Sequence, residues 1–252
     1  MNAPEAHLRS AALAAQRSEA VTMLAIQSAT DIASAALLDG DDLIGSLAFR
    51  AHRDVCQRLL PDVETMMARA GLNPRSLSAI AVGRGPGSFT GIRIGVAIAK
   101  GLALALEVPV FGISTLAACA YPALGQGGIA CALIRAHGDE FYAGIFHAGQ
   151  ELEPLGEGIW TGSELMALLS RSGDKVIFAP AAPQVRDLLP LNELKGESTF
   201  LPHELTWDLA CWVGRLAQAR VRAGDPGDGI GLAPVYLRPS QAEMQAGPSA
   251  KG

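Results

Sequence analysis

Residues 83–93 read GRGPGSFTGIR, and no other segment says as much about how this chain folds. The segment lies between an apolar run at 78–82, typical of a buried strand, and a longer apolar run at 92–106, typical of a helix. Its four glycines permit a tight turn and close backbone approach. Ser88 and Thr90 are both candidate N-caps for the helix. A strand, a glycine turn and a helix N-terminus gather backbone N–H groups around one point, which favours an anion.

The glycine segment matches neither of the common phosphate-binding motifs. A P-loop needs a lysine directly after its last glycine, and here the nearest lysine is Lys100, inside the predicted helix. The dinucleotide pattern Gly-x-Gly-x-x-Gly meets Ser88 or Thr90 where its last glycine should be. Two interpretations remain. The turn serves packing alone, or it forms a contact for an anion, a nucleotide or a partner through Gly85, Gly87, Ser88, Thr90 and Arg93.

The composition indicates a folded globular chain. Hydrophobic residues make up 49% of the 252 residues and charged residues 18%, enough for one large domain or two lobes. The net charge of −5 and the lack of a Lys/Arg-rich run predict that the chain alone binds nucleic acid poorly. The four cysteines form no Cys-x-x-Cys pair, so we expect neither zinc nor redox chemistry, and buried thiols in a reducing cytoplasm.

One apolar stretch, residues 92–113, raises the question of a membrane span. Charged residues and a proline interrupt it, at Arg93, Lys100, Glu107 and Pro109, so we expect no span. The apolar run at 11–15 is too short for a signal peptide. The sequence therefore predicts a cytoplasmic protein.

The order of predicted elements is that of an α/β protein with two lobes. In the first lobe we expect strands at 24–28, 33–38, 43–49, 79–82 and 108–113, with helices at 55–70 and 92–106. In the second we expect strands at 129–134, 140–146 and 176–179, a helix at 163–170 capped by Ser163, and a helix at 207–222. The predicted division is a flexible extension at 1–22, lobes at 23–125 and 126–239, and a disordered tail at 240–252.

Several segments together resemble the bacterial TsaB (YeaZ) family. The matching segments are GPGSFTGIRIGVAIAK at 85–100, VPVFGISTL at 108–116, MLAIQSAT at 23–30, HRD at 52–54 with LLP at 59–61, and PVYLR at 234–238. The resemblance runs from residue 23 to 238 and is strongest over 78–116. It implies a two-lobed actin/Hsp70/sugar-kinase-like fold, in which each lobe is a mixed sheet with flanking helices.

The residues that serve a magnesium-bound nucleotide in this fold class are replaced here. Gln27 stands where the TsaB family usually has Asp, and Arg135 and His137 stand where its second lobe often has Asp and then Arg. Mg²⁺ prefers carboxylate ligands, so the replacements argue against independent turnover of Mg-ATP, with Asp31 as the alternative carboxylate. The related catalytic TsaD family carries a His-x-x-x-His pair, and the corresponding window 114–119 has no histidine. We expect no catalytic residue, metal or cofactor.

The resemblance implies a non-catalytic accessory subunit for making N6-threonylcarbamoyladenosine beside the anticodon of tRNA. It implies dimerisation with a TsaD-type transferase, a TsaE-type ATPase as a further partner, and contact with tRNA only through the complex. The expected interface residues lie on the first-lobe helices, namely His52, Leu59, Leu60, Ile92 and Gly95. The alternatives are a free-standing ATP-dependent phosphoryl or carbamoyl transferase, and a homodimeric scaffold without nucleotide.

Small residues recur at a spacing of four in the helix after the glycine segment, at Gly91, Gly95, Ala99 and Ala103. They form a flat ridge on one face of the helix. The ridge packs either on the sheet of the same lobe or on a second subunit. If Gly95 lies at the interface, Gly95→Trp is expected to abolish assembly without unfolding the chain.

Overall fold

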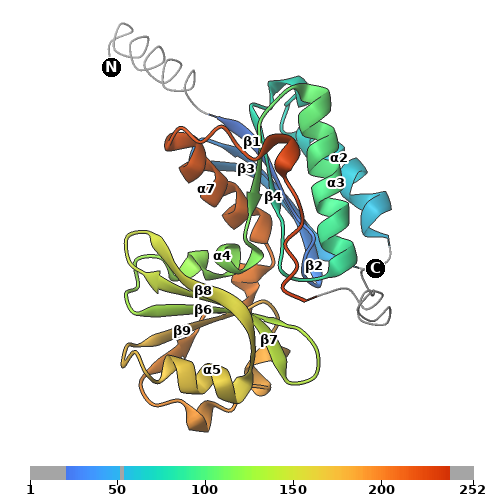
Figure 1. The fold of residues 1–252 in the computed structure, drawn as a ribbon. Helices are drawn as coiled ribbons and strands as arrows, with labels where there is room; N and C mark the ends of the chain where they lie inside the picture. The colour runs from blue at the N-terminus through green and yellow to red at the C-terminus, as the bar shows by residue number, and fades with distance from the viewer. Residues whose placement is uncertain (1–20, 52–53, 239–252) are drawn as a thin grey trace, which may run out of the picture.

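The computed structural model describes residues 21–51 and 54–238 and contains two mixed sheets of five strands each (Figure 1). The first sheet has the order β3-β2-β1-β4-β5. Its strands are β1 (Thr22–Gln27), β2 (Ile32–Asp39), β3 (Asp42–Arg50), β4 (Ala79–Gly83) and β5 (Val110–Ile113). The second has the order β10-β9-β6-β7-β8. Its strands are β6 (Ile129–Arg135), β7 (Glu140–Ala148), β8 (Leu152–Thr161), β9 (Val176–Pro180) and β10 (Ser198–Phe200).

The two sheets have the same topology. In the first, β1 pairs antiparallel with β2 and parallel with β4, while β2 pairs antiparallel with β3 and β4 pairs parallel with β5. In the second, β6, β7, β8, β9 and β10 take the corresponding places with the same directions. An antiparallel three-strand meander followed by two parallel strands therefore occurs twice, which confirms the predicted two-lobed actin-like fold.

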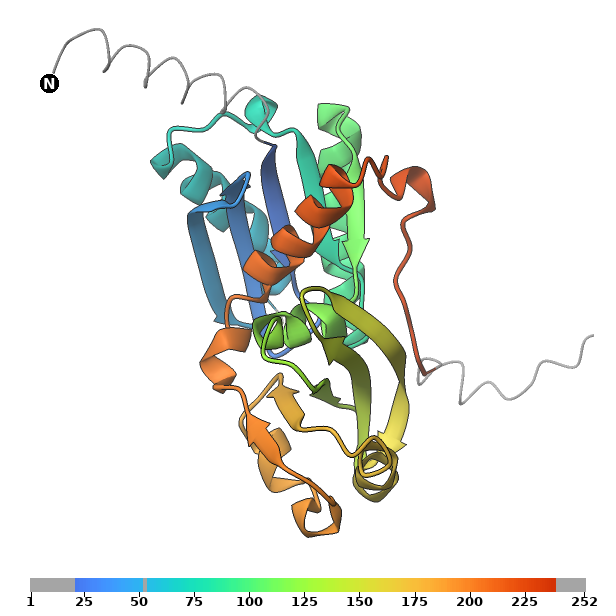
Figure 2. The ribbon, with the colours of Figure 1, turned by 90° about the vertical axis from the view of Figure 1, so that its left-hand side faces the viewer.

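Helices lie on both faces of each sheet and between the sheets (Figures 1 and 2). On the outer face of the first sheet lie α2 (Val55–Arg69) and α3 (Phe89–Leu106), and on its inner face lies α7 (Leu209–Arg222). Between the sheets lies α4 (Thr115–Ala120). The second sheet carries α5 (Gly162–Leu169) and the short α6 (Gln184–Asp187). Single-turn helices are η1 (Pro74–Ser76), η2 (Tyr121–Ala123), η3 (Leu191–Glu193), η4 (His203–Thr206) and η5 (Gly229–Gly231).

Three apolar clusters hold these layers together. The cluster between the sheets joins their facing sides through α4 and α7 and includes Met23, Phe111 and Phe146, all nearly or fully buried. The second cluster lies between the first sheet and the helices α2 and α3. The third lies between the second sheet and α5. Because the lobes share one continuous core, they form one folded body.

The chain returns to the first lobe after completing the second sheet, which corrects the predicted division. Residues 126–239 were expected to form the second lobe, but α7 packs on β1 and β2. Figure 2 shows α7 crossing the first sheet. The apolar side of α7 places Val213 and Ala217, both fully buried, in the core between the lobes. The proposed terminal extension and tail lie mostly outside the described residues, which begin at Val21 and end at Arg238.

The helix α5 begins earlier than its sequence indicated. Its N-cap is Thr161, not Ser163. The Thr161 hydroxyl accepts from the Glu164 backbone N–H, and the Glu164 carboxylate accepts from the Thr161 backbone N–H, so the two residues form a capping box. Besides the single-turn helices, two α-helices and two strands had no predicted counterpart, namely α4, α6, β8 and β10.

Candidate partner-binding surface and inter-lobe cleft

The inner face of α3 packs on the turn that follows β1. A Cβ atom added at Gly91 would lie 1.9 Å from the Ser28 carbonyl oxygen, and one added at Gly95 would lie 2.5 Å from the Ser28 hydroxyl. Only glycine at these two positions lets α3 approach the turn after β1 this closely. The small-residue ridge therefore packs on the sheet of its own lobe. Gly95 is buried there, so the expectation that it contacts a partner is wrong, and Gly95→Trp would disrupt the lobe itself.

The outer face of α3 is apolar and uncovered. It exposes Ala97, Gly101, Leu104 and Ala105, with Leu104 exposed to 83%. Only 33% of the helix residues are buried, although its mean hydropathy is 1.6. Arg93 begins this stripe, and the residues that follow it on the same face are apolar. An exposed apolar stripe of this kind marks a candidate association surface.

The cover for α3 is better supplied by protein than by lipid. Among the described helices, α3 is the one whose length and composition would allow a membrane span. However, α3 packs along β4 and β1, and it lies beside α2 on the first sheet (Figure 1). A helix anchored in this way to the core of a mixed sheet cannot leave it for a bilayer without breaking the lobe.

The neighbouring helix α2 adds a polar border to this apolar stripe. Its exposed residues include Gln57 and Glu64, while its buried residues recur at helical spacing from Val55 to Met67. An apolar centre with a polar rim is the usual anatomy of a protein interface. We refer to the exposed stripe of α3 together with Gln57 and Glu64 of α2 as the α2–α3 surface.

Several residues predicted to form the interface lie elsewhere. Leu59 and Ile92 have no exposed area and belong to the cluster beneath the helices, so the prediction that they contact a partner is wrong. Leu60 is half-buried on α2 and stays a candidate. His52 lies outside the described residues. Sequence reasoning chose the side of α3 that carries the small-residue ridge and missed the exposed stripe, which its all-round apolarity could have indicated.

The glycine segment forms the turn between β4 and α3. Ser88 is the N-cap of α3, because its hydroxyl accepts from the Gly91 backbone N–H at 3.2 Å, whereas Thr90 is already inside the helix. Gly85 and Gly87 have φ of +110° and +148°, values that other residues rarely adopt. A Cβ at Gly87 would lie 2.1 Å from the Ala29 carbonyl oxygen, so this loop also packs tightly on the turn after β1.

The closing motif at 234–238 covers one side of the glycine segment. The Val235 N–H donates to the Arg84 carbonyl at 2.7 Å, and the Val235 carbonyl lies against Gly85. The Arg93 Nε donates to the Tyr236 hydroxyl at 3.0 Å, with its guanidinium 3.8 Å above the Phe89 ring. Arg93 and Gly85 are thus engaged within the chain.

The lobes meet at a cleft of about 230 Å³ beside the glycine segment. Gly87 and Ser88 line it from the first lobe, and Arg135 and Tyr142 line it from the second. Asp31 is the carboxylate among the lining residues, and it is exposed. Two further contacts join the lobes near this cleft, a hydrogen bond of 2.5 Å from Ser114 to Glu157 and an ion pair between Arg238 and Glu140.

The residues at the two strand ends do not fit a magnesium-bound nucleotide. Gln27 is fully buried, and its Oε1 accepts from the N–H groups of Ser28 and Ala29 at 2.9 and 3.2 Å. The Oε1 atom therefore stabilises the turn after β1, while the buried Nε2 has no hydrogen-bond partner among the described residues. At the equivalent end of β6 stands Arg135, a cation. An amide held by its own backbone and a guanidinium are not ligands for Mg²⁺.

The window 114–119, in which the resemblance implies two histidines for the TsaD family, forms the N-cap and most of α4 here. Ser114 is its N-cap, accepting from the Ala117 N–H at 3.2 Å. The thiol of Cys119 is fully buried between the sheets, and that burial raises its pKa to about 12. A thiol with this pKa holds almost no thiolate at neutral pH, so Cys119 is not a nucleophile.

Comparisons with known proteins identify the family of this chain. A family model described as "TsaD: tRNA N6-adenosine threonylcarbamoyltransferase" matches residues 45–177, more than half of the chain. The structure "YeaZ from Pseudomonas aeruginosa" is 30% identical, with a TM-score of 0.71, over 86% of this chain and 100% of that one. The chain belongs to the TsaB (YeaZ) family.

Curated relatives of this TsaB-family chain carry the name "tRNA threonylcarbamoyladenosine biosynthesis protein TsaB". The one from Escherichia coli is 37% identical over 150 residues, which is 58% of this chain and 62% of that relative. The one from Bacillus subtilis is 32% identical over 126 residues, which is 50% of this chain and 55% of that relative. The matched region thus spans between half and two thirds of these relatives.

Proposed function

We propose that this TsaB-family chain is a non-catalytic accessory subunit for the synthesis of N6-threonylcarbamoyladenosine in tRNA. It binds a TsaD-type transferase through the α2–α3 surface and enables that enzyme. The observation that carries the proposal is the exposed apolar stripe of α3, which is anchored to the first sheet and bordered by the polar residues of α2. The assignment to threonylcarbamoyladenosine synthesis rests on the names of the curated relatives.

The partner's expected fold makes the α2–α3 surface a suitable contact. The chain itself matches the family model of the TsaD-type transferase, so such a partner has a first lobe of the same kind. Two related lobes can then pack helix pair against helix pair around a pseudo-two-fold axis, as in an isologous dimer. The small residues Ala97 and Gly101 would allow the facing helices to approach closely.

The chemistry of three residues supports an accessory role. The Gln27 Oε1 is held by its own turn, Arg135 stands where the resemblance implies a carboxylate, and Cys119 is a buried thiol outside the lining of the cleft. With a net charge of −5 the chain offers little attraction to tRNA, so tRNA contact falls to its partners. A TsaE-type ATPase is proposed as the further partner, and the complex is expected in the cytoplasm.

A reconstituted reaction tests the proposal. Threonylcarbamoyl transfer to tRNA is measured with the TsaD-type and TsaE-type proteins of the same organism, with and without this chain. We expect transfer only when the chain is present, and co-elution of the chain with the TsaD-type protein in gel filtration. Full transfer in its absence, or no association, would contradict the proposal.

Two controls distinguish the alternatives. Equilibrium dialysis of the isolated chain with Mg-ATP is expected to show no micromolar binding, and clear binding would favour the free-standing transferase. Sedimentation of the isolated chain reports self-association through the same surface. A homodimer that persists in the presence of the TsaD-type protein would favour the scaffold.

A further inference from the structure

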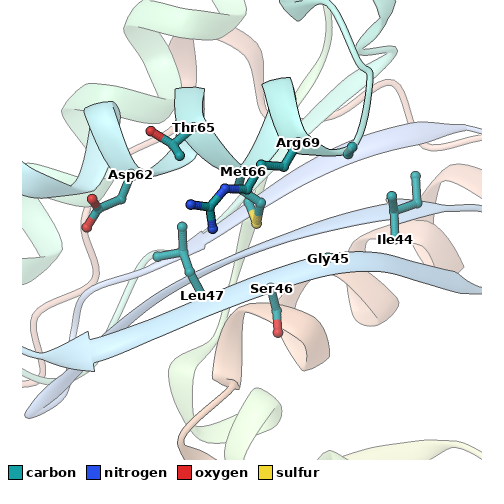
Figure 3. Close-up of a pocket in the computed structure, with 9 residues that line it drawn as sticks. Ile44, Gly45, Ser46, Leu47, Asp62, Thr65, Met66 and Arg69 are labelled. Carbon is teal, nitrogen blue, oxygen red and sulfur yellow. The ribbon is translucent and has the colours of Figure 1, made fainter.

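A groove runs between the edge strand β3 and helix α2, away from the exposed stripe of α3 (Figure 3). Its volume is about 480 Å³, and its walls include Ile44, Gly45 and Leu47 from the strand and Met66 and Arg69 from the helix. We refer to it as the β3–α2 groove. Figure 3 shows Leu47 pointing toward the helix, while Arg69 extends along the groove.

The groove is deep at Gly45 because this residue has no side chain to occupy the space between β3 and α2. The inward-facing positions of β3 are Gly45, Leu47 and Phe49, and the latter two pack against the cluster beneath α2. At Gly45 there is no side chain, and an added Cβ would lie 3.6 Å from the Met66 Cγ, an ordinary contact. An alanine would therefore fit at this position, so the close packing of the fold does not require a glycine here.

The outer edge of β3 is able to pair with another strand. Among the described residues, β3 pairs only with β2, and it is nine residues long. Edge strands of this length are usually protected by proline, lysine, a bulge or a cover. β3 contains neither proline nor lysine, and its pairing with β2 shifts register at Ile44, so the regular part of the edge is 45–50. The strand exposes Leu43 and Ile44 instead, to 43% and 40%.

The groove also presents a cation without a counter-ion. Asp62 lies within 4 Å of Arg58, which also lies over the Phe49 ring at one end of the groove. In the described parts of the chain, no carboxylate lies within 4 Å of the Arg69 guanidinium. An occupant with a carboxylate would supply the missing charge through a charge-assisted hydrogen bond.

The equivalent place in the second lobe is smaller and uncharged. Between β8 and α5 the hollow is about 220 Å³, and no charged side chain lines it. The ring of Trp160 lies there, 2.8 Å from where a Cβ on Gly158 would be. The same topology thus carries a small apolar hollow in one lobe and a larger groove with charged walls in the other.

We propose that the β3–α2 groove binds an extended acidic segment of another protein, which adds a strand along β3 and places a carboxylate on Arg69. Backbone hydrogen bonds to the strand edge would give affinity, and the hollow over Gly45 would take one side chain of the segment. A second copy of this chain is a poorer occupant, because its groove carboxylate Asp62 already has Arg58 as a partner. The site is separate from the exposed stripe of α3, so its test needs no transferase.

Peptide selection tests this directly. Random ten-residue peptides are displayed and selected on the full chain, with counter-selection on the Gly45→Val variant, and enriched peptides are synthesised and titrated. We expect peptides with alternating β-branched residues and a fixed Asp or Glu. Gly45→Val and Arg69→Glu should each weaken binding about 10-fold or more. The matched variant Gly156→Val, on the equivalent edge strand β8 and with no atom within 4 Å of its Cβ, should bind like the wild type.

Amide hydrogen exchange supplies a second measurement that does not depend on the variants. Bound peptide should protect alternate amides of β3 and leave those of β8 unchanged. The proposal is overturned if no selected peptide is weakened by Gly45→Val, or if the peptides carry no carboxylate and ignore Arg69→Glu. It is also overturned if Gly45→Val instead abolishes a concentration-dependent dimer of the peptide-free chain, which would identify a second copy as the occupant.

Discussion

The two lobes share one strand order but differ in what covers them. The outer face of the first sheet carries two long helices, α2 with 15 residues and α3 with 18, and α3 leaves Leu104 exposed to 83%. The second sheet carries α5 with eight residues and α6 with four. Trp160 also lines the edge hollow of the second lobe, which is about 220 Å³, while the corresponding groove of the first is about 480 Å³.

This difference indicates a division of labour within a duplicated fold. The second lobe also exposes single apolar side chains, Leu155 to 59% and Leu188 to 42%, while its sheet and α5 enclose a cluster of their own. The first lobe keeps apolar surface uncovered at α3 and at the edge of β3. Since exposed apolar patches of this kind mark association surfaces, the first lobe is the one built to bind.

The largest expected effect is on the free energy of unfolding, and it differs between the inner and outer faces of α3. Gly91→Ala places a Cβ within 1.9 Å of the Ser28 carbonyl oxygen, so the backbone must shift, and we expect a loss of about 3 kcal/mol or more in the free energy of unfolding. Gly101→Ala adds a Cβ with no atom within 4 Å, and we expect a gain of about 0.5–1 kcal/mol. Urea denaturation measures both, and equal effects would break the distinction between inner and outer faces.

The second prediction compares equivalent strand ends in the two lobes. Gln27→Leu removes the acceptor for two backbone N–H groups beside a fully buried side chain, and we expect a loss of about 2 kcal/mol or more. Arg135→Leu changes an exposed residue at the corresponding end of β6, and we expect a change within about 0.5 kcal/mol. A mild effect of Gln27→Leu would mean that Gln27 is free to serve a ligand.

The third prediction concerns the short helix of the second lobe. Thr161→Ala removes the N-cap of α5, and we expect a loss of about 1 kcal/mol. Ser88→Ala removes the N-cap of α3 and is the matched change in the first lobe. Hydrogen exchange should rise in α5 for the first variant and in α3 for the second. Faster exchange in both helices for either variant would show that the lobes do not respond separately.

The smallest expected effect is a pH dependence from the same capping box. The backbone N–H and then the hydroxyl of Thr161 donate to Glu164 and lower the pKa of that carboxyl below its ordinary value of 4.5. Because the pKa is lower in the folded state, the stabilisation is complete above the ordinary value and is lost as pH falls through the lowered one. Glu164→Gln should therefore be less stable than the wild type at neutral pH, and the two should converge in acid. A difference that persists unchanged in acid would refute this assignment.

Much of the first lobe could be predicted because its signals are local. The short apolar runs predicted β1, β2 and β3 to within about two residues, and the helical spacing of apolar residues predicted α2. The glycine segment was correctly placed between a strand and a helix, and Ser88, one of its two candidate caps, is the N-cap. In each of these places the residue pattern and the tertiary contacts favour the same structure.

The rest depends on contacts between distant parts of the chain. The strand β8 contains Pro154, Gly156 and Gly158 and has no alternating pattern, so its pairing with β7 determines its structure. No local sequence pattern predicts that α7 returns to the first sheet. The same holds for the hydrogen bond from Arg93 to Tyr236, because these residues are 143 positions apart. The exposed apolar residues of α3 could have been recognised in the sequence. The interface was instead predicted on the side that carries the regularly spaced small residues, and that side is buried.

The most direct test of the account is the affinity of this chain for its TsaD-type partner, measured by calorimetry with one matched pair of variants. Ala97→Glu puts a charge on the exposed stripe of α3, and Ala167→Glu puts the same charge on an exposed alanine of α5. Both should fold and melt like the wild type. We expect Ala97→Glu to weaken binding about 100-fold or more, because it buries an unpaired charge, and Ala167→Glu to bind normally. Equal affinities for the two variants would contradict the assignment of the first lobe as the binding lobe.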